Sequence, residues 1–232
     1  MIRWSPPGPY EIVFSTREGG VSEGPYASLN LGRMTGDDVD RVDDNRSILC
    51  AEVGADVQKL ALNRQIHSAT VHRAEAGSRG RPADGLWTDE PGLPILAMAA
   101  DCLPIALARA GGEAPAVAVL HAGWRGILAG IVEEGVQALG GRVHAAIGPG
   151  IGPCCYEVGP EVAQRFATTY GGALIHGRTL DLWGAAERAL LAAGVEDVHR
   201  IDLCTHCNPD RFFSHRRTGK PRGVQGVIAR VA

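Results

Sequence analysis

Apolar residues occur along the chain in short runs that alternate with longer amphipathic stretches. The short runs, bounded by polar or turn-forming residues, predict strands at residues 11–15, 60–66, 94–100, 116–120, 143–147, 198–203 and 224–230. Stretches with apolar positions on one helical face predict helices at residues 38–53, 127–139, 160–170 and 181–193. The alternation indicates an α/β or α+β fold, in which one mixed sheet is flanked by helices and the active site lies at strand ends. The polar, Gly-rich segment 16–36 predicts a long loop of the kind that often carries function.

Length and composition indicate a single compact domain spanning residues 1–232. Of the 232 residues, 45% are hydrophobic and 21% are charged, so the chain can bury a large core and is not intrinsically disordered. Its 23 basic and 26 acidic side chains give a net charge of −3, and no block of Lys and Arg occurs. This balance argues against a nucleic-acid partner. We expect a monomer, the default for a chain without an indication of assembly.

The sequence predicts neither a membrane span nor a signal peptide. The most apolar stretch, residues 93–108, is interrupted by Pro94, Asp101 and Pro104 and is too short to cross a bilayer. The N-terminus lacks the apolar core of a signal peptide. Six cysteines in a chain of this length do not resemble a secreted disulfide scaffold. We therefore expect a cytoplasmic protein whose thiols are buried, reactive or metal-bound.

Three potential metal ligands follow three of the predicted strands. His67, Cys102 and His121 come directly after the apolar runs 60–66, 94–100 and 116–120. If these strands are close together and end on the same side, their terminal side chains can converge on one ion. Three protein ligands are typical of catalytic zinc, which keeps a fourth position for water or substrate and lowers the pKa of bound water to about 7. Histidine with thiolate also suits copper, so zinc and copper both remain open as the metal.

A plainer interpretation of the same residues is a pair of hydrogen-bonded histidines and a buried thiol. The wide spacing in sequence favours it. The neighbouring residues favour the ligand interpretation, because Asp101 precedes Cys102, and Trp124 and Arg125 follow His121 within one turn. Acidic, cationic and aromatic groups at strand ends are costly to place there without a function.

Several sequence blocks resemble those of one known family. The strings ADCLPI at residues 100–105 and HAGWRG at residues 121–126 resemble the signature blocks of the laccase-domain family, also called the multicopper polyphenol oxidase family. Further blocks similar to that family's lie at residues 14–22, 28–32, 65–67, 147–159, 204–205 and 213–217. The resemblance therefore extends over nearly the whole chain, in order. Ser68, in place of the family's usual Gly, and the string 220–222 depart from its pattern.

The resemblance implies a zinc-dependent purine nucleoside phosphorylase. The family's zinc ligands correspond to His67, Cys102 and His121. It also implies phosphorolysis of adenosine, inosine and methylthioadenosine, with adenosine deamination as a second activity. The expected partners are thus a purine nucleoside and phosphate. Some members were first described as copper-dependent phenol oxidases.

Roles for individual residues follow as hypotheses. For deamination, Asp101 is the nearest candidate for the acid that carries a proton to the leaving ammonia; the alternative is a structural carboxylate. For phosphorolysis, phosphate needs a cationic cradle, and the candidates are Arg17, Arg46 and Arg125. The alternative for Arg46 is an ion pair on the helix surface. Arg125 is favoured because it lies one turn from a proposed ligand.

Other side chains are candidates for contacts with the nucleoside. Tyr156 and Trp124 have rings that can stack on a base, although Trp124 is also suited to core packing. Asn30 and Asp84 can hydrogen-bond a sugar, or they can be turn residues. Gln65 and Arg216 lie in blocks that resemble the family's, and they complete the expected substrate-binding set: Arg17, Asn30, Arg46, Gln65, Tyr156 and Arg216.

Four further cysteines raise the question of a second site. The string at residues 204–207 has the C-x-x-C spacing of zinc or redox sites, and with Cys154 and Cys155 it can make a four-thiolate set. We expect no structural zinc there, because adjacent cysteines rarely both reach one tetrahedral ion without strain.

Three other functions compete with a phosphorylase. A copper-dependent polyphenol oxidase can use the same ligands. A cysteine hydrolase would use Cys102 as nucleophile and His121 as base, without a metal. A non-catalytic binding module is the weakest of the three, given the Gly-rich loops and clustered charges.

Overall fold

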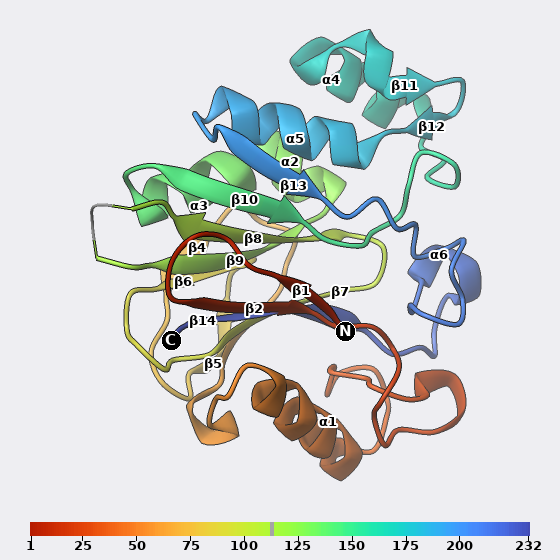
Figure 1. Cartoon of the computed structure of the whole chain (residues 1–232). Helices are drawn as coiled ribbons and strands as arrows, with labels where there is room; N and C mark the ends of the chain where they lie inside the picture. Colours follow the sequence, from red (N-terminus) through yellow and green to blue (C-terminus); the bar gives the residue numbers. More distant parts are fainter. Residues whose placement is uncertain (112–113) are drawn as a thin grey trace.

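Two six-stranded mixed sheets stack face to face, and helices cover both outer faces (Figure 1). The computed structural model describes residues 1–111 and 114–232. The first sheet has the strand order β1-β2-β14-β7-β3-β5, and the second has the order β13-β10-β8-β9-β6-β4. A small hairpin of β11 and β12 stands apart from both sheets. The predicted combination of helices with mixed β-structure is confirmed, but the prediction of one sheet is wrong.

The bounds of the elements follow the chain from end to end. The strands are β1 Ile2–Trp4, β2 Tyr10–Phe14, β3 Ala61–Arg64, β4 Val71–Arg73, β5 Arg79–Pro82, β6 Gly85–Thr88, β7 Ile95–Ala99, β8 Leu103–Arg109, β9 Val117–Ala122, β10 Val143–Ile147, β11 Ile175–His176, β12 Thr179–Leu180, β13 Asp197–Arg200 and β14 Gln225–Val231. The helices are α1 Val39–Glu52, α2 Trp124–Ala129, α3 Ile131–Leu139, α4 Pro160–Tyr170, α5 Leu182–Ala192 and α6 His215–Thr218. Three short 3₁₀ turns lie at Gly24–Tyr26, Val57–Lys59 and Gly172–Leu174.

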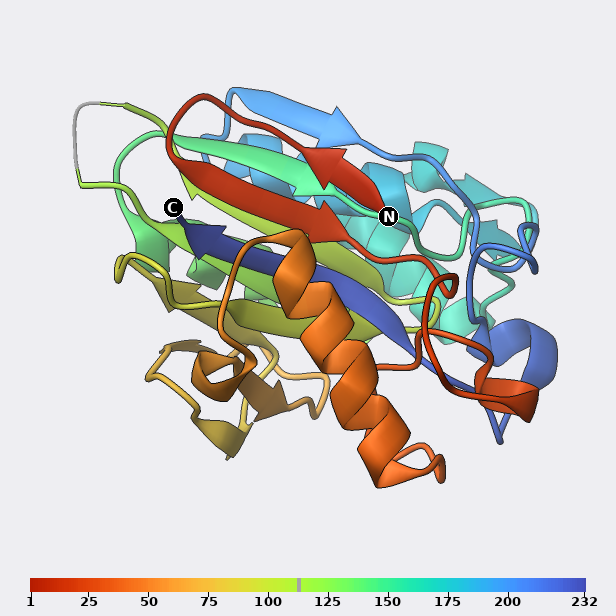
Figure 2. The ribbon, with the colours of Figure 1, turned by 60° about the horizontal axis from the view of Figure 1, so that its bottom comes forward.

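Burial of both sheet faces explains why the strands are apolar throughout. In β2, Ile12 and Phe14 belong to the core between the two sheets, whereas Val13 belongs to the layer under α1. Successive strand residues point to opposite faces, so a strand covered on both sides needs apolar residues at every position. Figure 2 shows α1 lying across the outer face of the first sheet. The other large helices cover the second sheet (Figure 1).

Continuous apolar runs also explain two errors in the predicted elements. The run at residues 93–108 contains two strands, β7 and β8, which belong to different sheets. The chain turns between them at Asp101, which has a positive φ of 89°. The predicted helix 127–139 is two helices, α2 and α3, because Gly130 adopts a left-handed conformation with φ 92° between them.

Three connections cross from the first sheet to the second at the same end of the molecule. Strands β3, β5 and β7 run parallel to one another, and the chain passes from them to β4, β6 and β8 of the other sheet. These connections contain His67, Asp84 and Cys102 respectively. Strand β9 runs antiparallel to β6 and β8, so it ends where they begin, and His121 lies near that end. The topology therefore gathers these four residues at one place.

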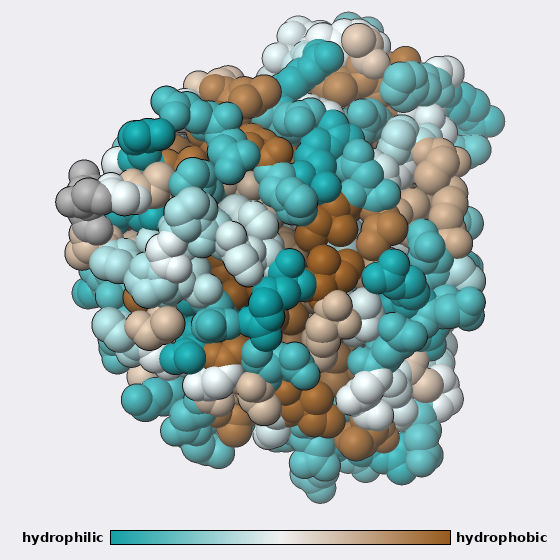
Figure 3. Space-filling view, viewed as in Figure 1, coloured by the Kyte–Doolittle hydropathy of each residue, from teal (hydrophilic) through white to brown (hydrophobic). Residues whose placement is uncertain are grey.

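The outer surface is mostly polar on the face shown in Figure 3, where hydrophobic residues form only an interrupted band near the centre. Among the helices of residues 1–111 and 114–232, none is long and apolar enough to cross a membrane.

Removal of the Phe14 side chain tests the core between the sheets. Phe14 is fully buried, and a Cβ built on Gly148 would lie 2.3 Å from its ring, so the ring leaves no spare space. We expect Phe14→Ala to lower the free energy of unfolding by about 3–5 kcal/mol, measured by urea denaturation. Met34→Ala is the control, because Met34 is 87% exposed and should change stability by less than about 0.5 kcal/mol. A loss below about 1 kcal/mol for Phe14→Ala would contradict this account of the core.

Candidate metal centre

His67, Cys102 and His121 converge where the connections cross between the sheets. One potential ligand atom from each lies within 4.8 Å of the other two. The Cys102 Sγ atom is 3.9 Å from His67 Nε2, and the two imidazole rings meet edge to face with centroids 4.8 Å apart. The predicted convergence is confirmed. It involves both sheets rather than neighbouring strands of one, and His121 lies inside β9 rather than beyond it.

Two of the residues at this place adopt a left-handed backbone that only glycine takes readily. His67 has φ 62° and Asp101 has φ 89°. Such a conformation costs on the order of 1–3 kcal/mol per residue and persists where neighbouring contacts hold it. The amide of His67 donates to Asp84, and the carboxylate of Asp101 is held by two donors described below. The local strain is thus offset by hydrogen bonds made by the same segments.

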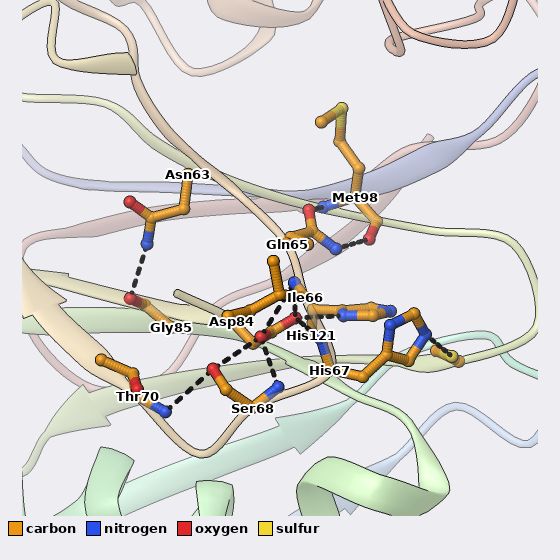
Figure 4. A network of polar contacts seen from close by, with 11 residues as sticks. Asn63, Gln65, Ile66, His67, Ser68, Thr70, Asp84, Gly85, Met98 and His121 are labelled. Atoms are coloured by element: carbon orange, nitrogen blue, oxygen red, sulfur yellow. Dashed lines mark hydrogen bonds and ion pairs between the residues drawn. The ribbon is translucent and has the colours of Figure 1, made fainter. Parts of the chain in front are cut away.

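Asp84 is the hydrogen-bond centre of the site (Figure 4). Its side chain, in a residue only 2% exposed, accepts the backbone N–H groups of Ile66, His67 and Ser68, and also the Ser68 hydroxyl. It also contacts His121, whose Nδ1 lies 2.8 Å from Asp84 Oδ1. Asp84 therefore fixes the connection that carries one proposed ligand and the ring of another.

Sequence reasoning missed this role for Asp84, which was predicted to bind a sugar or to shape a turn. The available signal was its position directly before the apolar strand Gly85–Thr88, at the third crossing between sheets. That signal is visible only when the two sheets are recognised.

Charge favours a metal at this place. Burial raises the pKa of Asp84, but the hydrogen bonds from His121 and Ser68 outweigh it and hold the pKa well below its usual range. Asp84 is therefore ionised and accepts the proton of His121 Nδ1, which leaves Nε2 as the ligand atom. Burial alone would raise the pKa of Cys102 and lower that of His121, yet their mutual attraction reverses both shifts. The resulting thiolate is the form that binds metals.

The space beside the three side chains is kept open by Gly123, the first residue after β9. A Cβ at this position would lie 2.9 Å from Cys102 Sγ and 3.2 Å from the His67 ring. In a tetrahedral zinc site, a sulfur and a nitrogen ligand are about 3.6 Å apart, close to the distance between Cys102 and His67. The donor set, its spacing and the absence of a side chain at Gly123 fit a three-ligand metal site.

Asp101 is buried next to Cys102, and both of its carboxylate oxygens are occupied. Oδ1 accepts the Thr205 hydroxyl at 2.6 Å, and Oδ2 accepts the backbone N–H of Arg216 at 2.6 Å. The Asp101 carbonyl also accepts the N–H of Ile151. Of the two hypotheses for Asp101, these contacts favour the structural carboxylate, because it ties the loops after β10 and β13 to the metal-ligand turn.

An aromatic and several cationic side chains surround this centre. The Arg216 guanidinium lies 5.3 Å from the centre of the Tyr156 ring and donates to the carbonyl of Glu157. Burial and the negative charges of Cys102 and Asp101 raise the pKa of Tyr156, so its phenol stays protonated.

Arg125 is exposed at the start of α2, with its guanidinium 4.3 Å from the centre of the Trp124 ring. Trp124 itself packs against the core of the second sheet, as one of the two hypotheses for it expects.

Arg222 has a buried donor without a partner. Its Nε atom makes no hydrogen bond to any part of the chain that the structure describes. Burial lowers the pKa of Arg222, and the negative charges of Asp101 and Cys102 act against that shift, which places the guanidinium in the field of the site. An unpartnered buried N–H of a cation is suited to an anionic ligand.

Two of the expected substrate contacts are contradicted by burial. Asn30 is fully buried, and its amide bonds Thr35, Asp37 and the backbone of Gly32 and Val224. It organises the loop 16–36 and has no group left facing a nucleoside.

Arg46 is 3% exposed and donates from Nε to the carbonyl of Leu31. It is neither a phosphate ligand nor a surface ion pair. Burial lowers its pKa to about 10. Because it lies on the inward face of α1, helical periodicity alone could not separate it from a solvent-facing arginine.

Arg17 and Gln65 also have partners within the chain. Arg17 donates to the carbonyls of Ala27 and Pro209 and lies over the Phe213 ring, so it joins the first loop to the C-terminal one. Gln65 pairs with the backbone of Met98 through both ends of its amide (Figure 4). This pairing continues the β3–β7 contact beyond Arg64 and supports the turn at His67.

Known proteins resemble the chain over almost its full length. Residues 11–231 match the family described as "Multi-copper polyphenol oxidoreductase laccase". The protein named purine nucleoside phosphorylase YfiH of Escherichia coli is 38% identical over 226 residues, which cover 93% of this chain and 91% of that protein. Purine nucleoside phosphorylase YlmD of Geobacillus stearothermophilus is 36% identical, with 91% of this chain and 85% of that protein covered.

Solved structures share the fold. The crystal structure of YlmD from Geobacillus stearothermophilus matches 96% of this chain and 92% of its own with a TM-score of 0.87 and 31% identity. A Bacillus licheniformis protein named YfiH matches 96% and 93% with a TM-score of 0.90 and 27% identity. Since the match in sequence and in structure extends over nearly all of both chains, the chain belongs to the multi-copper polyphenol oxidoreductase laccase family.

Proposed function

We propose that the protein is a zinc-dependent purine nucleoside phosphorylase, with adenosine deamination as a second activity. The observation that carries this proposal is the His67, Cys102 and His121 cluster, held by Asp84 at the crossing between the sheets. Relatives named purine nucleoside phosphorylases, up to 38% identical, support the reaction class. The substrates are then adenosine, inosine or methylthioadenosine, together with phosphate.

The three ligands suit zinc, because two imidazoles and one thiolate leave a tetrahedral ion one position for water or substrate. When bound, the metal supplies a Lewis acid and a water of lowered pKa. Copper fits the same donors, so a copper-loaded form remains compatible with the site. The chain's own contribution is to hold His121 in one tautomer through Asp84 and to present Cys102 as a thiolate.

Phosphorolysis breaks the bond between the purine nitrogen and C1′ of the ribose and forms a bond from C1′ to a phosphate oxygen. We assign phosphate binding to Arg222 and Arg125, because Arg222 offers a buried donor without a partner in the described structure and Arg125 is exposed one turn after β9. Tyr156 remains protonated and can donate a hydrogen bond to the departing base. Asp101 acts as a positioning residue, since it holds the backbone of Arg216 and the side chain of Thr205.

A cysteine hydrolase is the second candidate, and one specific observation favours it. Asp84, His121 and Cys102 form a chain of contacts in which a carboxylate orients an imidazole beside a thiolate. This is the order of groups in nucleophilic cysteine catalysis. The two candidates differ in their need for a metal, because a bound ion would occupy both the sulfur and the Nε2 atom that a hydrolase needs free.

Chromatography of adenosine incubated with zinc-loaded protein tests the proposed function. We expect adenine to form only when phosphate is present, and inosine to form at a lower rate without it. Cys102→Ala should abolish both products, whereas Cys50→Ala, which removes a buried thiol of the α1 layer, should retain both. Activity that persists after chelation and dialysis would contradict the metal-dependent reaction and favour the hydrolase. Absence of both products from zinc-loaded protein would exclude the proposed substrates.

Asp84→Asn tests the positioning of His121. The amide can no longer accept every donor around it, so His121 loses its fixed tautomer and we expect zinc affinity to fall about 10- to 100-fold. Zinc binding is measured by competition with a chromophoric chelator on protein shown to be folded by circular dichroism. Asp89→Asn is the matched control, because Asp89 pairs with Arg73 at the surface and should leave zinc binding unchanged. An unaltered zinc affinity in Asp84→Asn would refute the role of Asp84.

Arg222→Gln tests the phosphate assignment. Loss of a charge-assisted hydrogen bond is worth about 1.5–3 kcal/mol, so the KM for phosphate should rise roughly 10- to 100-fold while zinc content stays constant. Arg142→Ala serves as the control, because Arg142 precedes β10 at the opposite end of the sheet and is paired with Glu196. If the KM for phosphate stays constant in Arg222→Gln, then Arg222 does not bind phosphate.

A further inference from the structure

A second group of potential metal ligands lies outside the centre described above. The thiols of Cys154, Cys155, Cys204 and Cys207 all lie within 4.8 Å of one another. Cys207 Sγ is 3.5 Å from Cys154 Sγ and 3.3 Å from Cys155 Sγ. The expectation that adjacent cysteines cannot share one site with the C-x-x-C pair is therefore wrong for this geometry.

Two loops bring these thiols together. The first follows β10 and carries Cys154 and Cys155, and the second follows β13 and carries the C-x-x-C pair. The loops are fastened to each other where Gly150 and Cys204 form a parallel bridge and the N–H of Thr205 donates to the Gly150 carbonyl. The cysteine cluster is thus built on a backbone contact rather than on flexible side chains alone.

Local turns explain how all four thiols face one point. The N–H groups of Cys155 and Tyr156 both donate to the carbonyl of Gly152, which coils residues 152–156 into a tight turn. In an extended strand, neighbouring side chains point to opposite faces, but in this turn both adjacent thiols reach the same side. On the other loop, the N–H and the side-chain amide of Asn208 donate to the Cys204 carbonyl and close the turn of the C-x-x-C pair.

The spacing of the sulfurs matches a tetrahedral ion. With a metal–sulfur distance of about 2.3 Å, the sulfurs of a four-thiolate zinc site are roughly 3.8 Å apart. The 3.3 and 3.5 Å separations here lie near that value, and the 4.8 Å limit leaves only small rotations to complete the set. Both separations are far longer than the bond of about 2.05 Å in a disulfide.

The surroundings favour thiolates. The backbone N–H of Gly152 donates to Cys204 Sγ at 3.3 Å, a contact that stabilises negative charge on sulfur. The guanidinium of Arg217 donates to the carbonyls of Thr205 and His206, the two residues between the paired cysteines, and so brings a positive charge to the same loop. Cys204 is buried, whereas Cys154 and Cys207 are exposed, which gives an ion a route from solvent.

We propose that Cys154, Cys155, Cys204 and Cys207 form a structural site for one Zn²⁺, separate from the His67, Cys102 and His121 centre. Four thiolates close the coordination sphere, so this ion keeps no position for substrate. It would instead fasten the two loops whose next residues reach the first centre. Thr205 donates to Asp101, and Tyr156 follows directly after Cys155. The proposal does not depend on the proposed reaction, because the ion is counted without an activity assay.

Metal stoichiometry tests the proposal. Protein is purified with a reductant, stripped with a chelator, reloaded with zinc and analysed by mass spectrometry of the elements and by thiol titration. We expect two zinc ions per chain in the unaltered protein and one in Cys154→Ser/Cys207→Ser, a pair chosen because both residues are exposed and carry no packing. Cys102→Ala should also retain one ion. Cys50→Ala should retain two, because this buried cysteine belongs to neither cluster.

Cobalt substitution identifies the ligands of each ion. The sulfur-to-cobalt charge-transfer band should lose most of its intensity in Cys154→Ser/Cys207→Ser and only a minor part in Cys102→Ala, because four of the five proposed cysteine ligands belong to this cluster. One zinc ion in the unaltered protein, with no change in the double variant, would overturn the proposal. So would iron in place of zinc, or a disulfide within the cluster together with no uptake of a second ion after reduction.

Discussion

A single buried carboxylate holds together the place where the two sheets exchange strands. Asp84 accepts three consecutive backbone N–H groups from the β3–β4 connection and the imidazole of His121 from β9. A carboxylate buried without such donors would cost several kcal/mol, so its burial and these contacts require each other. Once it is satisfied, the turn at His67 and the ring of His121 have one arrangement. Cys102 meets them there because its own connection crosses at the same end.

The sequence supported prediction of this centre only in part, and the reasons are physical. Strand ends are visible as the last residues of apolar runs, which is why His67, Cys102 and His121 could be selected without a structure. Two sheets could not be distinguished from one, because a strand buried on both faces carries no alternation of apolar and polar residues. The partners of Asp84 come from segments distant in sequence, so no local pattern reveals them.

Burial decided the candidates that failed. Asn30 and Arg46 have residue types that commonly bind ligands, but α1 and the first loop enclose them and use their donors internally. Arg222 shows the opposite case, in which an arginine in a block departing from the family's pattern keeps a buried donor without a partner among the described residues. Composition and motif identify the chemistry that a side chain can offer, whereas solvent exclusion determines whether that chemistry is available.

The crossing of chain between the sheets also bears on the order of folding events. The contacts around Asp84 join residues between 16 and 37 positions apart, so they cannot form before the two sheets have paired. The first metal centre would then assemble late, and an ion bound there would stabilise only the completed native state. The C-x-x-C turn is different, because two of its thiols are three residues apart and can meet in an unfolded chain. An ion held early by that pair would restrain the C-terminal loop while the rest of the chain is still searching for its partners.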